Sequence, residues 1–463
     1  MKGKLVVDSV HGDIHLSELE WRIVDTPEFQ RLRNLKQLQM GHLTYPNATH
    51  TRFAHSLGVF AVMSRVLETL DGAGLNDDDV RRLRLAALLH DIGHYPYSHL
   101  MEKVDRVVIT EEFVEGGIKT LNAGAEAYPD HEEVGSIIVS CREGISELVG
   151  GSAEAQKISN LFRRTDEADA QLSKLIHSSL DMDRLDYLIR DSKATGAPYG
   201  GIDLDYLLNN VTISPGGLIG VSEKAMPAAE HFLLARLYMH RCVYWHKTTF
   251  GFEEACKQLL HRVRRDPERA ESYGLAVDGV EIRTLVASDK LGTFTDAYVD
   301  RVIHAATADA EPVIAALANC IAGRRAPKLV KEVSTFSAET VTAGTQFKQA
   351  CRFRLATLAE RYCIPLGQFL FAESKPLTLE ERAALMTAEE ADKRDPAERE
   401  ELIKVFRRGV AEPVSLVEIP ESPIAQLARN RFMLRRLYVV CADDAQARVI
   451  DDICKEVADW DAT

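Results

Sequence analysis

The chain has 463 residues, 46% of them hydrophobic, which allows roughly two or three domains with a large core, and no apolar run approaches the roughly 18 residues of a membrane-spanning helix. Its formal net charge of −14 argues against a protein whose main task is to bind nucleic acid. Eight cysteines are scattered singly and the N-terminus lacks a signal-peptide pattern, so we expect a cytoplasmic protein with reduced thiols.

The beginning of the chain is predicted to be one short strand followed by helices. Residues 5–7 form a β-prone run, and the Ser-Glu-Leu-Glu segment at 17–20 is a capping-box pattern that opens a helix. Thr26, which precedes a proline, predicts the N-cap of the next helix. Apolar residues then recur at helical spacing over residues 57–70 and again over residues 77–91.

The remainder of the chain is also predicted to be mostly helical. His131 opens one helix, residues 172–189 show a strong helical pattern, and the longest predicted helix spans residues 227–263 with almost no breaker except Gly251. Residues 374–400 are rich in alanine and charge and are expected to form an exposed helical excursion or a connector. The fold class is therefore mainly α with a small α+β C-terminal region, which consists of expected strands at 414–419 and 437–441 and a helix at 445–457.

Four histidine and aspartate residues lie within these apolar helices. An isolated His-Asp dipeptide is usually a surface feature, but His90-Asp91 ends an apolar helix. His55 starts another apolar helix, and Asp183 lies within a third. Burying several ionisable groups costs several kcal/mol unless they are paired or bind a metal. Two imidazoles and two carboxylates suit Mn, Fe, Ni, Co or Zn, and we expect Mg to accompany a phosphorylated substrate.

The order His, His-Asp, Asp resembles the signature of the HD-domain metal-dependent phosphohydrolases. The flanking segments 25–38, 50–59 and 181–187 are similar, more specifically, to the dNTP triphosphohydrolases, in the branch that includes bacterial dGTPase-like enzymes and the mammalian enzyme with a SAM and an HD domain. The resemblance is dense over residues 8–247 and thin beyond them. It implies two parts, which are an HD phosphohydrolase catalytic domain at 1–300 and a helical and α+β region for regulation or oligomerisation at 301–463.

The resemblance implies roles for residues around the scissile phosphate. Three further histidines would donate to phosphate and transfer protons, since imidazole titrates near neutrality, and an acid would orient one of them. The alternative is that they are ordinary histidines on helix surfaces. These residues are His94, His99 and His131, with Glu102 as the acid.

Other residues are implied to hold the nucleotide. Arg52 would contact phosphate oxygens, because a planar guanidinium group can donate two hydrogen bonds to a phosphate. Tyr187 and Asp191 follow Asp183 at i+4 and i+8 on one helix face and would hold the sugar, Asp191 through the 3′-hydroxyl. Tyr244 would stack on the deoxyribose, although an amphipathic helix with a solvated basic edge is the alternative there. The implied substrate-binding set is Gln37, Leu38, Arg52, Arg184, Tyr187, Asp191, Arg236, His240, Tyr244 and Lys247.

A regulatory nucleotide site is implied by a third group. Asp25, Gln30 and Arg33 match the guanine-recognising residues of the mammalian members, where an aspartate accepts from a purine edge and an arginine binds phosphate. A surface helix that carries these residue types by chance is the alternative. The resemblance implies a homo-oligomer, a dimer or a tetramer, that a purine nucleotide activates.

The sequence therefore predicts a metal-dependent enzyme that converts a dNTP and water to a deoxynucleoside and inorganic triphosphate. One alternative is an HD phosphohydrolase for a nucleoside monophosphate, a cyclic dinucleotide or a guanosine alarmone. Another is a nucleotide sensor or nucleic-acid binder on an HD scaffold. The sugar-binding set favours the first activity, and the intact metal-ligand set argues against the last.

Overall fold

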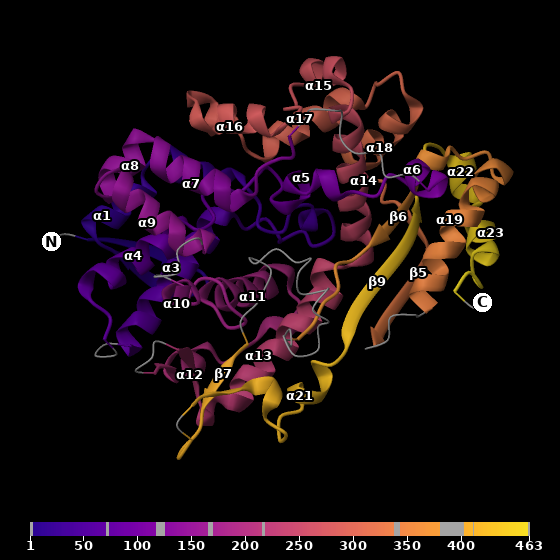
Figure 1. Ribbon diagram of the computed structural model, residues 1–463. Helices are drawn as coiled ribbons and strands as arrows, with labels where there is room; N and C mark the ends of the chain where they lie inside the picture. Colours follow the sequence, from indigo (N-terminus) through magenta and orange to yellow (C-terminus); the bar gives the residue numbers. More distant parts are fainter. Residues whose placement is uncertain are drawn as a thin grey trace.

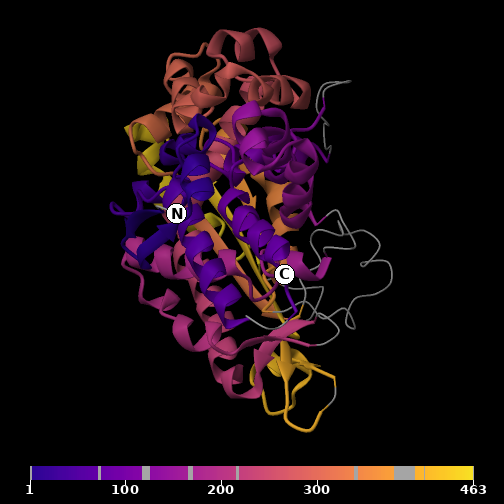
Figure 2. The ribbon, with the colours of Figure 1, turned by 90° about the vertical axis from the view of Figure 1, so that its left-hand side faces the viewer.

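The computed structural model describes residues 3–70, 74–116, 126–164, 170–214, 218–337, 343–379, 402–410 and 412–461. Helices dominate, which confirms the predicted fold class (Figure 1). The N-terminus lies among the helices at one end of the molecule, and the C-terminus lies at the opposite end beside a small sheet (Figures 1 and 2). None of the described helices combines the length and the apolar character required to cross a membrane.

The N-terminal half is built around three packed helices, α3 (Arg52–Thr69), α4 (Asp77–Leu89) and α11 (Met182–Thr195). Side-chain caps fix where helices start: Asn76 and Asp79 form a capping box on α4, and Asp181 accepts a hydrogen bond from Arg184 N on α11. A hairpin of β1 (Lys4–Asp8) and β2 (Gly12–Leu16) precedes them. The other helices here are α1 (Glu18–Val24), α2 (Pro27–Gln30), α5 (His99–Glu102), α6 (Thr110–Glu115), α7 (His131–Cys141), α8 (Glu143–Val149), α9 (Ser152–Arg163), α10 (Ala170–Ser173) and α12 (Leu204–Leu208).

Several predicted helix starts are confirmed by their caps. Ser17 and Glu20 make the expected capping box on α1, and Thr26 accepts from Phe29 N at the start of α2. α7 begins at His131, as predicted, with Asp130 as its N-cap. These starts depend on contacts between residues that are two or three apart in sequence, which is why a sequence pattern can locate them.

Two predicted long helices are wrong because capping groups inside them start new helices. The pattern at 172–189 is divided into α10 and α11, since Asp181 also accepts from Ser178 N and ends the preceding turn. The pattern at 227–263 is divided into α13 (Met226–Met239), a π-helical turn (His240–Tyr244) and α14 (Lys247–Arg264). His246 has an extended backbone and its side chain accepts from Thr248 N, so the break lies there and not at Gly251.

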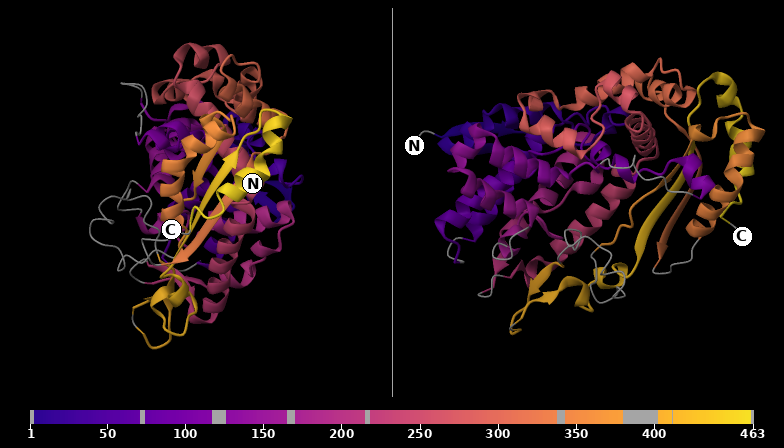
Figure 3. Two further views of the ribbon diagram at one scale, coloured as in Figure 1. Left: turned by 90° about the vertical axis from the view of Figure 1, so that its right-hand side faces the viewer. Right: turned by 45° about the horizontal axis from the view of Figure 1, so that its top comes forward.

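The C-terminal sheet has the antiparallel order β5-β9-β6, formed by β5 (Lys328–Ser337), β9 (Arg431–Val439) and β6 (Phe369–Glu373). Helices α19 (Ala343–Arg361) and α23 (Ile450–Glu456) pack on its outer side, and α14 packs against the sheet from the helical half (Figure 3). The strand expected at 437–441 is confirmed in part, since β9 begins earlier and ends at Val439. The helix expected at 445–457 is divided at Val449 into α22 (Asp444–Arg448) and α23.

A second sheet joins the end of the chain to its middle. Its order is β3 (Val211–Ile213), β4 (Ile219–Ser222), β7 (Lys404–Phe406) and β8 (Val414–Ser415), and β4 pairs with β7 in parallel. The strand expected at 414–419 is only two residues long and continues as a 3-10 turn. Of the excursion expected at 374–400, residues 380–400 lie outside the described part of the chain. The remaining helices are α15 (Pro267–Tyr273), α16 (Gly279–Ala287), α17 (Asp296–Ala306), which contains the expected domain boundary at 300, α18 (Pro312–Ala322) and α21 (Ile424–Leu427).

The contact between α3 and α11 requires glycine at residue 58. A Cβ atom on Gly58 would lie 2.0 Å from Asp186 Oδ1 and 2.3 Å from Arg190 Nη2. Both side chains are buried, so neither can move into solvent. Glycine therefore allows α11 to bring the Asp186 carboxylate against α3.

We expect Gly58→Ala to lower the melting temperature. Alanine is favoured over glycine within a helix by about 1 kcal/mol, but overpacking a buried contact costs about 1–3 kcal/mol. Thermal unfolding followed by circular dichroism measures the outcome. Gly144→Ala is the control, since an added Cβ on that α8 residue meets nothing within 4 Å and should leave the melting temperature equal or higher. Equal shifts for the two variants would contradict the close packing.

Candidate metal centre and substrate cavity

Four side chains from the helical half converge on one point. α3 supplies His55, the end of α4 supplies His90 and Asp91, and α11 supplies Asp183. Ligand atoms of His55, His90 and Asp91 all lie within 4.8 Å of one another. Asp183 Oδ1 lies 2.9 Å from His55 Nε2 and 3.8 Å from His90 Nε2. The fold thus brings together the four residues that were predicted as metal ligands.

The two imidazole rings each leave one nitrogen available to a cation. His55 Nδ1 lies 2.7 Å from Asp186 Oδ2, and His90 Nδ1 lies 2.9 Å from the carbonyl oxygen of Ala87. In the neutral form of each ring, with Nδ1 donating, Nε2 carries a lone pair. Both Nε2 atoms are buried and face carboxylate oxygens, with His55 Nε2 2.9 Å from Asp183 Oδ1 and His90 Nε2 3.4 Å from Asp91 Oδ1. Buried lone pairs beside carboxylates require a positive charge, so this donor set fits a divalent metal.

The pKa of His55 also indicates that the carboxylates around it favour a positive charge at this position. Burial lowers the pKa of His55, but the carboxylates of Asp183, Asp186 and Asp91 outweigh burial and raise this pKa to about 10. A proton on the ring satisfies the carboxylates when no metal does. Because a metal must replace that proton, binding of the metal is expected to release it.

The Asp186 carboxylate holds the metal-site histidine from behind. It is buried, lies 2.7 Å from His55 Nδ1 and 2.6 Å from His11 Nε2, and accepts from Arg190 Nε at 2.9 Å. Arg190 also donates to Asp8 Oδ1 at 2.9 Å. Burial raises the pKa of Asp186, but its histidine and arginine partners outweigh burial and hold this pKa well below the usual range. The β1–β2 hairpin is therefore part of the support of the metal site.

Three more histidines form a second cluster beside the first. Their ring nitrogens lie within 4.8 Å of one another, and His94 stacks on His131 at a centroid distance of 4.2 Å. Glu102 binds two of them, with Oε2 2.5 Å from His99 Nδ1 and Oε1 3.0 Å from His131 Nδ1. One carboxylate therefore orients both rings and directs the remaining Nε2 of each away from itself.

The loop between His94 and His99 has a strained backbone. Tyr97 and Ser98 have φ angles of 50° and 52°, which are uncommon for residues with side chains. Tyr97 N donates to Asp296 Oδ1 at 2.8 Å, and Ser98 Oγ accepts from the Nε of Arg52 at 3.0 Å. These contacts hold the tight turn that returns the chain, so that both histidines lie at the same cavity.

The two histidines that share Glu102 have opposite pKa shifts. Burial lowers the pKa of both, but Glu102 outweighs burial at His131 and raises its pKa to about 9. At His99, burial and the nearby ammonium of Lys103 prevail, and the pKa falls to about 4. At neutral pH, His131 is therefore protonated and His99 is neutral, which is the arrangement of an acid beside a base.

One wall of the cavity is organised by Asp191. Its Oδ2 accepts from Tyr244 Oη at 2.8 Å, and its Oδ1 lies 2.7 Å from His50 Nε2. The Tyr187 ring lies 6.2 Å from the Tyr244 ring, and burial raises the pKa of Tyr187 to about 12, so both phenols stay neutral donors. The carboxylate keeps lone pairs available to a hydroxyl in the cavity.

A cavity of about 600 Å³ is lined by three of the four predicted metal ligands, by the three histidines of the second cluster and by this wall; His55 does not line it. Arg52 lies at its edge with the metal ligands and donates to Asp91 Oδ2 at 2.6 Å. Of the ten predicted substrate-binding residues, those that line the cavity are Gln37, Leu38, Arg52, Tyr187, Asp191, His240 and Tyr244. Those that do not line it are Arg184, whose Nε lies 3.3 Å from Asp181 Oδ2, Arg236, which is close enough to lower the pKa of Tyr187, and Lys247, which is exposed.

The three predicted regulatory residues lie outside the cavity. Asp25 pairs with Lys4 at 2.9 Å on the surface, and Gln30 accepts from Arg33 Nε at 2.7 Å. The Arg33 guanidinium lies 3.5 Å from the centre of the Phe53 ring. Two of the three predicted residues therefore touch, and the third has a different partner.

Several residues that line the cavity or support its side chains were not predicted from the sequence. Asp186 and His50 lie inside the segments that carry the resemblance, but no role was assigned to either. His11 is 175 residues from its partner Asp186, so no local signal could have identified it. No sequence pattern indicated that several further charged or titratable residues line the same cavity. Among them are Lys103, Glu132, His177, Glu253, Lys257 and Lys375.

Comparisons with protein families identify the helical half. Residues 52–191 match the HD domain, and residues 202–302 match the HD associated region. An uncharacterized protein of Methanocaldococcus jannaschii is 38% identical over 248 residues, or 53% of this chain and 46% of that protein. The YwfO protein of Bacillus subtilis, also uncharacterized, is 34% identical over 57% of this chain and 56% of its own length. The chain spans about half the length of these relatives.

A shorter match and two structures complete the comparisons. The human deoxynucleoside triphosphate triphosphohydrolase SAMHD1 is 42% identical over 103 residues, which are 21% of this chain and 16% of that enzyme. A phosphohydrolase from Bacteroides thetaiotaomicron has the same fold, with a TM-score of 0.67 and 23% identity over 94% of this chain and all of that one. A hypothetical protein from Aquifex aeolicus gives a TM-score of 0.69 at 23% identity over 98% of this chain and all of that one. The predicted HD domain is confirmed.

We expect Asp183→Ala to lose the metal while it keeps its helical content. Removing one of two carboxylates leaves the buried imidazoles without a full ligand set. Metal analysis of the purified protein should fall from about one ion per chain to near zero. The stabilisation by added metal, about 2.7 kcal/mol at 100 times Kd, should also disappear. Asp205→Asn, at an exposed carboxylate, should keep both properties; an Asp183→Ala protein with full metal content would refute the ligand set.

We expect Glu102→Gln to lower the pKa of His131 from about 9 by at least about one unit. The carboxylate raises that pKa, so without it the imidazolium loses its proton nearer to neutral pH, and activity should fall at a lower pH on the alkaline side. NMR titration of the histidine ring protons and the pH–rate profile measure both effects. Glu133→Gln is the control, because Glu133 lies on the same helix but pairs with Arg283 at 2.8 Å. An unchanged His131 titration would disprove the assigned cause.

Proposed function

We propose that this chain, which carries an HD domain followed by an HD associated region, is a metal-dependent phosphohydrolase that cleaves dNTPs to deoxynucleosides and inorganic triphosphate. The observation that carries the proposal is the position of Asp191. Its carboxylate, held by Tyr244 and His50, lies in the same cavity as the metal ligands. Asp191 can accept a hydrogen bond from a sugar hydroxyl, and the metal ligands beside it can activate a phosphate. This combination suits a nucleotide whose bond between the 5′-oxygen and phosphorus is cleaved.

The metal would be held by His55, His90, Asp91 and Asp183. When bound, it supplies a Lewis acid that polarises a phosphoryl oxygen and lowers the pKa of water. Arg52 then balances negative charge on the phosphate, since its guanidinium already lies at Asp91 and lines the cavity. The ion is one of Mn, Fe, Ni, Co or Zn by its ligand types, with Mg on the triphosphate.

Proton transfer falls to the histidines that share Glu102. His131 Nδ1 faces Glu102, so the protonated ring offers Nε2–H to the cavity. This proton can be donated to the departing 5′-oxygen, or to phosphate, as the bond to phosphorus breaks. His99 is neutral, with Nδ1 on the same carboxylate, and its Nε2 can accept a proton from the attacking water. His94, buried and stacked on His131, keeps the ring in place.

Recognition of the sugar follows from the shape of the wall. Asp191 accepts the 3′-hydroxyl, because its two oxygens still have lone pairs beside Tyr244 and His50. Tyr187 fills the space next to it and leaves little room for a 2′-hydroxyl. Leu38 and Gln37 line the same cavity and would contact the edge of the sugar.

Regulation by a nucleotide is a second part of the proposal. Arg33 stacks on Phe53, and Phe53 is bonded in sequence to Arg52 of the cavity. A purine nucleotide that binds Asp25, Gln30 and Arg33 would therefore act on the phosphate-binding arginine through one residue. The resemblance of the sequence to the dNTP triphosphohydrolases supports a dimer or a tetramer with such a site between subunits.

The test is incubation with each dNTP and each candidate metal, followed by chromatography of the products. We expect deoxynucleoside and triphosphate in equal amounts, with dGTP cleaved faster than GTP. Asp191→Asn should reduce kcat/KM by about 10–100-fold, as expected for a lost charge-assisted hydrogen bond. Release of monophosphate with pyrophosphate, or hydrolysis of a cyclic dinucleotide or an alarmone instead, would reassign the chain to another HD phosphohydrolase activity.

A further inference from the structure

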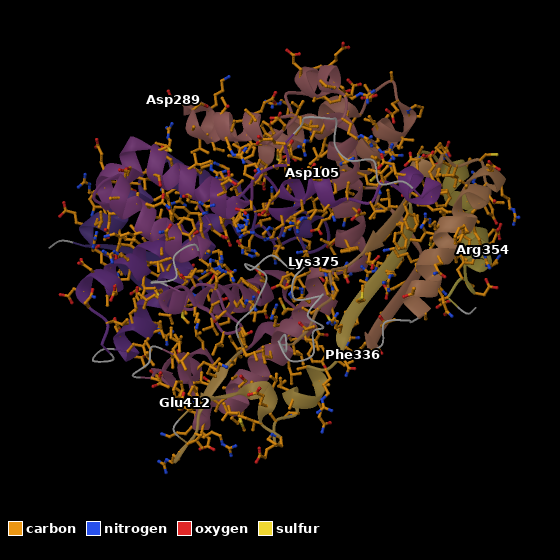
Figure 4. All side chains as sticks on the ribbon, in the orientation of Figure 1. Asp105, Asp289, Phe336, Arg354, Lys375 and Glu412 are labelled. Atoms are coloured by element: carbon orange, nitrogen blue, oxygen red, sulfur yellow. The ribbon has the colours of Figure 1, made fainter. Side chains whose placement is uncertain are left out.

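One wall of the cavity, formed by the start of α14, has no role in the proposed reaction. Thr249, Phe250 and Glu253 line the cavity from this helix, and their spacing places them on one helix face. The wall begins shortly after Tyr244, which the proposed reaction places at the sugar. The cavity also reaches the C-terminal sheet, since Lys375 lines it and lies between the helical half and β9 (Figure 4).

Aromatic rings give this part of the cavity a flat, fixed surface. Trp245 lines the cavity and stacks on Phe432 of β9, with ring centroids 5.6 Å apart and an interplanar angle of 15°. Arg436 Nη1 donates to the carbonyl oxygen of Trp245 at 2.7 Å, which fixes the backbone at this residue. Phe250 lines the same cavity one helical turn further along the chain. Flat aromatic side chains with few polar groups among them are typical of a site for a planar ring.

Glu253 is a polar group on this wall that lacks a partner. It makes no hydrogen bond or ion pair with any residue that the structure describes, although it lines the cavity and is only partly exposed. The adjacent acid, Glu254, accepts from Lys257 Nζ at 2.8 Å, so the nearby ammonium is already bound to another carboxylate. A partly buried carboxyl group without a partner costs free energy that a ligand with hydrogen-bonding groups can recover.

The surroundings of Glu253 favour its uncharged form. Burial, together with the charge of Glu254, outweighs Lys257 and raises the pKa of Glu253 to about 8. None of the predicted metal ligands is among the charges that act on it. At neutral pH the carboxyl group is therefore mostly protonated and offers one O–H donor beside one carbonyl acceptor. Because either oxygen can carry the proton, the donor and the acceptor can face a ligand in either order.

We propose that Glu253 recognises the nucleobase of the substrate, by hydrogen bonds between its carboxyl group and the edge of a base that lies against Trp245 and Phe250. The inference rests on the proposed function, because it takes the sugar to lie at Asp191 and Tyr244. A nucleotide carries its phosphate and its base on opposite sides of the sugar ring. With the phosphate at the metal ligands, the base is directed away from them, and the wall that continues from Tyr244 is available to it.

A single carboxyl group of this kind suits all four bases. Adenine and cytosine present an amino donor beside a ring nitrogen acceptor, whereas guanine and thymine present a ring N–H donor beside a carbonyl acceptor. An uncharged carboxyl group matches both orders. An ionised carboxylate only accepts, so it would favour guanine, which has two N–H donors side by side. We therefore expect a broad base range.

The experiment measures binding of the four 2′-deoxynucleosides to the metal-loaded protein by titration calorimetry. These ligands have no phosphate, so nothing is cleaved. We expect their Kd values to agree within about threefold, and Glu253→Leu to raise each by about tenfold, as for the loss of two neutral hydrogen bonds. Glu253→Gln keeps a donor and an acceptor and should stay within about twofold. Glu268→Leu, at an exposed glutamate of α15, is the control and should leave the Kd unchanged.

A ligand change separates hydrogen bonding from a change in the shape of the cavity. The difluorotoluene deoxynucleoside has the shape of thymidine but is a poor hydrogen-bonding partner. We expect it to bind the unmodified protein about tenfold more weakly than thymidine, and to bind Glu253→Leu as well as thymidine does. An equal loss in both proteins would mean that Glu253 makes no hydrogen bond to the base, and would overturn the inference. Circular dichroism of each variant excludes loss of the fold.

The same measurements keep this inference distinct from the proposed reaction. Binding of deoxynucleosides that depends on Glu253, in a protein that cleaves no dNTP, would retain the base site and reject the reaction. Cleavage of dNTPs by a protein in which Glu253→Leu leaves every Kd unchanged would retain the reaction and overturn the base site.

Discussion

The geometry of the metal site depends on the packing of the helical half, because both are linked by one buried carboxylate, Asp186. Placing one ionised group inside a protein costs several kcal/mol unless each of its oxygens is satisfied. Here the partners are His55 from α3, Arg190 one helical turn away, and His11 from the N-terminal hairpin. Moving any of these elements leaves a buried charge uncompensated. The orientation of the metal-binding imidazole is consequently tied to the packing of three separate segments.

The cavity separates opposite chemical roles by small differences in environment. Glu102 contacts two histidines, yet one ring is protonated at neutral pH and the other is not. The difference arises because burial and Lys103 lower the pKa of His99, whereas at His131 the carboxylates of Glu102, Glu132 and Asp91 outweigh burial. The same lysine lines the cavity, so the acid–base pair and the cavity wall share this side chain.

Several irregular backbone segments carry or adjoin residues that line the cavity. The segment between α10 and α11 ends with Asp181, which caps the helix that carries Asp183, Tyr187 and Asp191. The π-helical turn before α14 presents His240 and Tyr244 to the cavity, and its extra residue per turn alters the face that an unbroken helix would show. Local strain at Tyr97 and Ser98 has the same association with the site. Departures from ideal geometry at functional positions are a general feature of enzymes.

The sequence by itself determined the mainly α fold, the helix starts at Ser17, Thr26 and His131, and the residues of the HD pattern. These features depend on hydrophobic periodicity and on contacts between near neighbours in the chain, which a linear pattern records. The sequence did not reveal the breaks at Asp181 and His246, because either residue can also occur within a continuous helix. Only the hydrogen bond from the backbone to each side chain shows that a new helix starts there. Tertiary structure alone paired β4 with β7, joined His11 to Asp186, and brought Lys103, Lys257 and Lys375 to the wall of one cavity. Such contacts join residues far apart in sequence, and their energies depend on burial and distance, which only the packed fold sets.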